Sequence, residues 1–162
     1  MICYTFYNSP MGKLLLTGDG YSLTGLFTGN YEIPERGENT SEGFEKVFLW
    51  LDAYFRGEIS DPEFSIRLDG TPFQMQVWEI LKTIPYGKVI TYGDIAREMA
   101  LRMDKPKMSA QAVGGAVGRN PISIIIPCHR VIGASQRLTG YAGGLDKKRW
   151  LLLHEGYTKF RE

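Results

Sequence analysis

Three short strand-like segments occupy the first 28 residues, and they restrict this part of the chain to a small sheet. The segments lie near residues 2–7, 13–18 and 22–28 and have alternating or β-rich patterns. Turn-forming residues at 8–10 and 18–20 separate them. Strands joined by such short turns pair in an antiparallel way. The pattern therefore predicts a small antiparallel sheet at the start of the chain.

One amphipathic helix is expected after this sheet. Apolar residues recur at helical spacing from Phe44 to Phe55, and a helix with one apolar face covers a sheet. The polar and acidic stretch 30–42 is typical of a loop. The boundary of this first part is expected at residues 68–70, which gives an N-terminal domain over residues 1–70.

The remaining residues, 71–162, contain a series of helix start signals. Thr71 precedes a proline, Thr91 begins a capping box with Asp94, and Ser109 precedes a run of small residues. The predicted helices run from Thr71 to before Pro85, from Thr91 to about Met99, and from Ser109 to about Gly118. Two short helices in series suggest a helix-turn-helix, although the connector 100–108 is longer than in the strict motif.

A winged helix is the variant of this motif that fits the rest of the chain. The glycine-rich stretch Gly140–Gly144 is expected to form a wing-like loop, and Asp146 to cap a last helix that ends near Gly156. The predicted fold class is α+β. A small N-terminal antiparallel sheet with a covering helix is followed by a helical winged helix-turn-helix domain over residues 71–162.

The charge of the chain is divided unevenly between these two parts. Residues 1–70 hold 5 Lys+Arg and 11 Asp+Glu, a net charge of −6, whereas residues 71–162 hold 14 and 7, a net charge of +7. A basic half is suited to a polyanion such as duplex DNA. The alternative is an ordinary surface with dispersed charges. No stretch approaches the ~20 apolar residues of a membrane span, and we expect a cytoplasmic protein without membrane contact.

The chain has few residues that bind metals or form disulfides. Its only cysteines and histidines are Cys3, Cys128, His129 and His154, and no CxxC or HxxxH pairing brings them together. Cys3 lies in a strand-like segment, and no secretion signal suggests a disulfide. We therefore expect neither a metal site nor a cofactor.

Cys128 is the residue that points most clearly to chemistry. It follows the apolar run 124–127 and precedes His129 and Arg130. A thiol has a pKa of about 8.5, so a base or a cation is needed to populate the thiolate near neutral pH. His129 and Arg130 can supply these. The alternative is a small apolar side chain that fills a gap in the core.

Several motifs in residues 73–156 occur together in one known family. They are the Pro-Cys-His-Arg-Val sequence at 127–131 and the segments 73–78, 87–92 and 112–116. With these motifs the chain resembles the methylated-DNA-protein-cysteine methyltransferases, also called O6-alkylguanine-DNA alkyltransferases. Residues 1–70 match this family only loosely, and the resemblance implies a ribonuclease H-like domain there.

The resemblance implies a DNA repair protein that acts on double-stranded DNA containing O6-alkylguanine. Such a protein, expected to be a monomer, rotates the damaged nucleotide out of the duplex and transfers its alkyl group irreversibly to its own cysteine. Cys128 is then the nucleophile and alkyl acceptor, and His129 is the general base through a water. Glu155 orients His129, and Asn120 holds the turns that carry Cys128. Because a thioether is not hydrolysed under cellular conditions, each molecule is expected to react once.

The family pattern also implies positions that contact DNA. Tyr92 donates to the flipped base, and Val117, Val131 and Tyr141 line its pocket. The helix after residue 108 enters the minor groove. Its expected DNA-binding residues are Ser109, Ala110, Gln111, Ala112, Gly114 and Arg119.

One position departs from the family pattern. Many members have an arginine immediately before Ala112, where it replaces the flipped base in the stack, but this chain has Gln111. Glutamine can hydrogen-bond an orphaned cytosine, although it lacks the charge and the stacking plane of a guanidinium.

Other interpretations of these residues remain. The chain could be a winged-helix DNA-binding protein without chemistry, or a cysteine hydrolase that uses Cys128, His129 and Glu155. Individually, Tyr92 could be only the first residue of a helix, Glu155 a solvated carboxylate at a helix end, and His154 a packing residue. The small-faced helix could pack against another helix of its own domain.

Overall fold

The computed structural model describes residues 1–162 and consists of two compact units. The first unit comprises Met1–Leu68 and Pro121–Ile125, and the second comprises Asp69–Asn120 and Ile126–Glu162. The expected division into 1–70 and 71–162 has no place for residues 121–125, which belong with the first unit. A single cut in the sequence therefore does not describe the two units.

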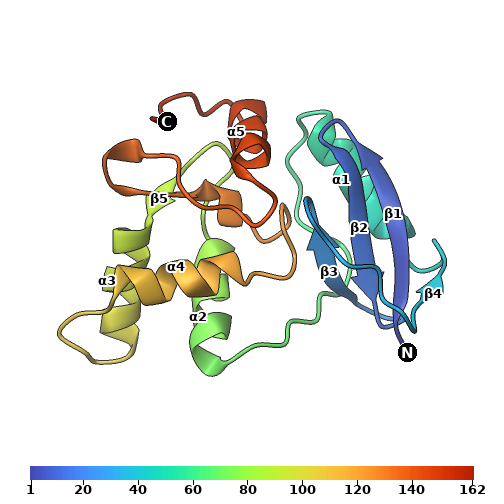
Figure 1. Ribbon diagram of the computed structural model, residues 1–162, viewed down its shortest axis with the longest axis horizontal. Coiled ribbons are helices and arrows are strands. Elements are labelled where there is room, and N and C mark those ends of the chain that lie inside the picture. Colours follow the sequence, from blue (N-terminus) through green and yellow to red (C-terminus); the bar gives the residue numbers. More distant parts are fainter. The chain divides into compact units, whose positions relative to one another are not determined.

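The first unit contains the predicted antiparallel sheet (Figure 1). Strands β1 (Cys3–Ser9), β2 (Gly12–Gly18) and β3 (Leu23–Phe27) pair in sequence order through hairpins, which confirms the prediction. A two-residue strand, β4 (Glu38–Asn39), adds to β1 in a parallel direction. This strand lies in the stretch that was expected to be only a loop. Its acidic sequence carries no strand pattern, and backbone pairing alone defines it.

The predicted covering helix is α1 (Glu45–Phe55). Val47, Leu51 and Tyr54 form its buried face, as the helical spacing of the apolar residues indicated. The rings of Phe48 and Phe55 pack against Tyr7 of β1, with centroid distances of 5.5 and 6.1 Å.

The segment 121–125 joins the edge of this sheet. The Leu26 N–H donates to the carbonyl of Pro121 at 2.9 Å, and the Ser123 N–H donates to the carbonyl of Leu26 at 3.1 Å. Ile122 and Ile124 are buried. The apolar run that leads to Cys128 is therefore part of a core, as its composition indicated.

Three helices form the body of the second unit (Figure 1). They are α2 (Pro72–Leu81), α3 (Tyr92–Arg102) and α4 (Ala110–Gly118). Their N-caps are Thr71, Thr91 and Ser109, as predicted, and α3 continues three residues beyond its expected end at Met99. Trp78 of α2 ties the bundle together, because its buried indole N–H donates to the carbonyl of Ala116 in α4 at 2.9 Å.

The rest of the second unit connects the segment around Cys128 to these helices. A 3-10 turn, η1 (Cys128–Arg130), leads into β6 (Val131–Ile132), which pairs in a parallel direction with β5 (Ile90–Thr91) directly before α3. A second 3-10 turn, η2 (Ala134–Gln136), follows. The pairing of β5 with β6 places the residues after Cys128 beside the start of α3.

The last helix, α5 (Leu145–His154), begins two residues earlier than predicted. Its N-cap is Gly144, not Asp146, which lies in the first turn and makes no cap hydrogen bond. The chain enters this helix with φ of +101° at Gly144, a conformation that glycine adopts and aspartate avoids. The α+β fold class is confirmed, and none of the helices is long and apolar enough to cross a membrane.

Candidate active site

Two tight turns precede Cys128 in the chain. The Ile125 N–H donates to the carbonyl of Ser123 at 2.8 Å around Ile124, whose φ is +71°. This is the rarer, strained form of the γ-turn, and a positive φ is unusual for a β-branched residue. The Cys128 N–H then donates to the carbonyl of Ile126 at 2.8 Å around Pro127, whose φ of −81° and ψ of 67° define an inverse γ-turn. This second turn fixes the direction in which the backbone enters Cys128.

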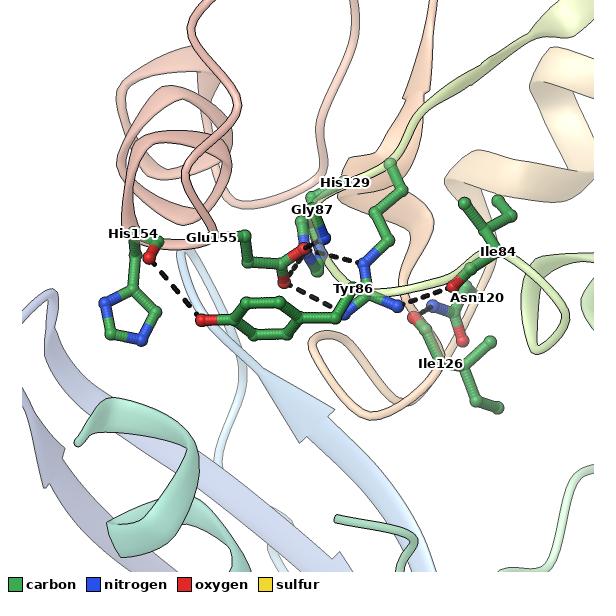
Figure 2. A network of polar contacts seen from close by, with 9 residues as sticks. Ile84, Tyr86, Gly87, Asn120, Ile126, His129, His154 and Glu155 are labelled. Carbon is green, nitrogen blue, oxygen red and sulfur yellow. Dashed lines mark hydrogen bonds and ion pairs between the residues drawn. The ribbon is translucent and has the colours of Figure 1, made fainter. Parts of the chain in front are cut away.

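Asn120 supports the second of these turns. Its buried side-chain amide donates to the carbonyl of Ile126 at 2.8 Å (Figure 2). The same carbonyl accepts the N–H of Cys128. Asn120 therefore contacts the turn that the family resemblance assigned to it.

Glu155, the C-cap of α5, lies at the centre of a buried polar network (Figure 2). Its Oε2 is 2.7 Å from His129 Nε2 and accepts from Arg130 Nη2 at 3.0 Å. Its Oε1 accepts from Arg130 Nε at 2.8 Å and from the Gly87 N–H at 3.2 Å. Only 6% of Glu155 is exposed, so the interpretation as a solvated carboxylate at a helix end is wrong.

Gly87 is required by this arrangement. Its φ is +78°, and a Cβ atom at this position would lie 3.0 Å from the backbone carbonyl oxygen of Glu155. The turn before β5 can therefore approach the end of α5 closely only with glycine here. This contact adds a backbone donor to the carboxylate.

The hydrogen bonds determine the tautomer of His129. Its Nε2 is held by Glu155, whereas its buried Nδ1 has no hydrogen-bond partner in the protein. Burial lowers the pKa of His129; Glu155 opposes this shift, and the charges of Arg130 and Lys148 reinforce it. The ring is therefore neutral, with Nε2–H donating to the carboxylate and the Nδ1 lone pair available to accept a proton.

Glu155 itself remains ionised. Burial alone would raise the pKa of its carboxyl group, but the hydrogen bonds from His129 and Arg130 and the charge of Arg130 outweigh burial and hold the pKa well below its usual range. The carboxylate is thus a permanent acceptor for the imidazole.

Arg130 has a different position from the one that the sequence suggested. It was expected beside the thiol as a cation, but its guanidinium donates to both oxygens of Glu155 and, through Nη1, to the carbonyl of Ile84 at 2.7 Å. The guanidinium also lies over the ring of Tyr86, 5.7 Å from its centroid. Only 9% of Arg130 is exposed.

Lys148 belongs to the site and was missed by the sequence analysis. It is fully buried, and its amine donates to the carbonyls of Thr139 and Gly140 at 2.6 and 3.0 Å. Burial lowers the pKa of Lys148 to about 8, while the charge of a Cys128 thiolate acts in the opposite direction. Helical spacing offered a signal, because Lys148 and Glu155 lie on the same face of α5 as the buried Leu151 and Leu152.

Tyr92, the first residue of α3, lies beside this lysine. Its hydroxyl donates to the carbonyl of Thr139 at 3.3 Å, and the Lys148 amine lies 5.8 Å from the centre of its ring. Burial raises the pKa of Tyr92, the hydrogen bond to Thr139 lowers it, and the nearby Cys128 raises it further. Tyr92 is therefore a protonated donor near the thiol and more than a helix-initiating residue.

The remaining predicted pocket residues are also in the second unit. Val117 and Val131 are buried, Tyr141 is half-buried, and 7% of Cys128 is exposed. His154 is a packing residue, as expected, because its ring stacks on Trp150 at 4.9 Å. Neither Cys3 nor Cys128 is in a disulfide.

The helix α4 has one packed face and one open face. Val113, Ala116 and Val117 are buried, whereas five residues predicted to bind DNA are exposed: Ser109, Ala110, Gln111, Ala112 and Arg119. The sixth, Gly114, is partly buried near the ring of Tyr92. A Cβ atom at Gly115 would meet no other atom within 4 Å. The small residues of the open face are therefore not explained by packing within the chain.

Comparisons with known proteins agree with this geometry. A family model described as the DNA binding domain of 6-O-methylguanine DNA methyltransferase matches residues 72–157, and one described as its ribonuclease-like domain matches residues 2–69. Methylated-DNA--protein-cysteine methyltransferases are 45% identical to the chain in Haemophilus influenzae, over 92% of the chain and 83% of the relative, and in Methanosarcina acetivorans, over 94% and 97%. The crystal structure of Mycobacterium tuberculosis OGT in complex with DNA is similar with a TM-score of 0.85 and 43% identity, over 94% of this chain and 91% of that one. The chain belongs to the O6-methylguanine DNA methyltransferase family.

Proposed function

We propose that this protein repairs O6-alkylguanine in duplex DNA by transferring the alkyl group to Cys128, once per molecule. The observation that carries this proposal is a buried group of three residues, Glu155, neutral His129 and Cys128. Glu155 holds Nε2 of the imidazole, and no other protein group uses the accepting nitrogen, Nδ1. Membership of the family supplies the substrate class.

The first step is removal of the thiol proton. His129 Nδ1 accepts this proton through a water, and Glu155 stabilises the imidazolium that forms. Lys148 and Tyr92 lie close enough to Cys128 to interact with its charge, and the lysine favours the thiolate. The thiolate is the nucleophile.

The second step is displacement at the alkyl carbon. The Cys128 sulfur forms a bond to this carbon while the bond from carbon to the guanine O6 breaks, and the electron pair leaves with the purine. Tyr92 donates its hydroxyl proton to the departing base. No tetrahedral intermediate forms, so no oxyanion hole is needed. The product is a thioether, which water does not cleave, and the protein is consumed.

The flipped nucleotide is delivered by the open face of α4. A small exposed surface allows the helix to approach the DNA backbone in the minor groove, where long side chains are not required. Val117, Val131 and Tyr141 would line the base pocket, and the exposed Arg119 at the end of α4 would meet a phosphate. Action as a monomer and a cytoplasmic location both stay predictions.

Mass spectrometry tests the proposed function. After incubation with duplex DNA containing O6-methylguanine, the intact protein should gain the mass of one methyl group and no more, and peptide mapping should place it on Cys128. A DNA-binding protein without chemistry would gain no mass. A cysteine hydrolase would show turnover without a lasting product. Turnover beyond one equivalent would contradict the proposal.

DNA binding should depend on salt and on the basic second half of the chain. Charge reversal at the exposed Arg119 or Lys107 should weaken binding and lower the slope of log K against log salt by about one for each lost phosphate contact. Reversal at the exposed Arg36 of the first unit is the control and should have little effect. Fluorescence anisotropy at several salt concentrations measures this. Equal losses from both halves would contradict the charge argument.

Gln111 should fill the gap that the flipped guanine leaves. Gln111→Ala should slow transfer from duplex DNA by about tenfold, because flipping costs a few kcal/mol, and should leave the reaction with free O6-alkylguanine base nearly unchanged. Gln111→Arg should match or exceed the wild type on duplex DNA, since arginine adds a stacking plane and a charge. Single-turnover rates on both substrates decide this. If alanine slows both substrates equally, Gln111 is not the intercalating residue.

A further inference from the structure

The buried carboxylate of the site has two partners of different kinds. Glu155 accepts from the neutral imidazole of His129 and also from two nitrogens of Arg130, at 2.8 and 3.0 Å. These three residues are between 0 and 9% exposed. Arg130 has no part in the two chemical steps of the reaction, so its burial next to His129 needs another explanation.

An isolated buried carboxylate would favour protonation of the histidine that it contacts. An opposite charge within hydrogen-bond distance stabilises the imidazolium, and such a ring can no longer accept the thiol proton. Arg130 changes this balance because it already pairs with the carboxylate. A proton added to His129 would then create a second buried cation against one anion, which low dielectric surroundings oppose.

We propose that Arg130 is a positioning residue that keeps His129 neutral, by neutralising Glu155 through both of its oxygens. This inference rests on the proposed function, because it explains how the site retains an accepting imidazole at mildly acidic pH. The other charged and titratable groups around the His129 ring do not favour its protonation either. Lys148 on α5 adds a further cation, and burial raises the pKa of both Tyr86 and Tyr92, which are therefore neutral.

The geometry requires an arginine in this role. The guanidinium binds the two carboxylate oxygens through Nε and Nη2 and uses Nη1 for the carbonyl of Ile84, while its face lies on Tyr86. A planar fork can satisfy all of these contacts together. Lysine could supply the charge but only one point of attachment. Arg130→Lys should therefore keep His129 neutral less effectively than arginine does.

The first test measures the protonation of His129 in the unreacted wild-type protein. In ¹⁵N-labelled protein, the side-chain nitrogen shifts of His129 should remain those of the neutral tautomer with a proton on Nε2 at pH values below about 6.5, the ordinary pKa of histidine. An imidazolium signal from His129 at neutral pH would overturn the inference.

The second test removes the compensating charge. In Arg130→Gln, the midpoint of His129 protonation should rise by about one pH unit or more, and alkyl transfer should fall about tenfold near pH 6 but recover at pH 8.5. Arg130→Lys should shift the midpoint less. Adding Glu155→Gln to Arg130→Gln should lower the midpoint again, since the anion that favours protonation is then gone. Arg56→Gln, which breaks an exposed ion pair with Glu58 in the first unit, is the matched control and should shift nothing.

These measurements separate the inference from the proposed function. The midpoint of His129 is observed without any DNA, so it reports on Arg130 even if the substrate is wrong. A merely structural role for Arg130 would lower transfer equally at all pH values and leave the midpoint in place, which would overturn the inference. If Arg130→Gln does not fold, the wild-type titration and Arg130→Lys still decide.

Discussion

Replacing Cys128 with serine should abolish alkyl transfer while leaving DNA binding intact. A hydroxyl group is far less acidic than a thiol, so the neutral His129 cannot generate an appreciable amount of the alkoxide. We expect the single-turnover rate on methylated duplex DNA to fall by at least about a thousandfold. Affinity for the same DNA should stay within about twofold, because the contact surface on α4 is not altered.

Cys3 provides the matched control for this substitution. It is the other cysteine of the chain, it is also buried, and it lies in β1 of the first unit without a neighbouring histidine in the sequence. Cys3→Ala should transfer the alkyl group at nearly the wild-type rate. Measurable transfer by Cys128→Ser, or loss of transfer in Cys3→Ala when the variant is folded, would show that the acceptor has been assigned wrongly.

The helix boundaries could be predicted because their signals are local. Thr71, Thr91 and Ser109 each accept a hydrogen bond from a backbone N–H three residues later, so the residues that define the helix start are neighbours in the sequence. The start of α5 was wrong by two residues for a related reason. Asp146 has a capping side chain, but the backbone conformation at Gly144 determines where the helix begins.

The features that were missed depend on long-range contacts. β4 and the segment 121–125 are held by parallel backbone pairing with β1 and β3, and no pattern in their own sequences names these partners. The segment 121–125 was recognised as apolar, but its place in the first unit could not be read from composition. Local sequence therefore predicts where helices and strands lie better than it predicts which segments pair with one another.

In the active site, too, local features could be predicted from the sequence, whereas long-range contacts could not. The contact between His129 and Glu155 could not be predicted from spacing, since the two residues are 26 positions apart in the sequence. It was expected only from the family resemblance. The interpretation of Arg130 as a cation for the thiol came from its proximity in the sequence, but the 3-10 turn η1 directs its side chain to Glu155. Lys148 could have been found, because it occupies a buried position on the apolar face of α5.

Removing the carboxylate of Glu155 should cost more stability than any surface substitution. In Glu155→Ala the guanidinium of Arg130 loses its buried counterion, and the Gly87 N–H loses an acceptor. Breaking a buried ion pair from one side typically costs about 3–5 kcal/mol. Glu58→Ala, which removes an exposed partner of Arg56, is the control and should change the free energy of unfolding by less than about 0.5 kcal/mol. Urea unfolding monitored by circular dichroism measures both.

The size of this loss should depend on pH in a defined direction. The pKa of Glu155 is lower in the folded protein than its ordinary value of 4.5, so the carboxylate stabilises the fold fully above that pH. As the pH falls below 4.5, the unfolded chain takes up the proton first, and the difference in unfolding free energy between the wild type and Glu155→Ala should shrink. A difference that stays constant from pH 7 to pH 3.5 would mean that packing of the side chain, and not its charge, stabilises this site.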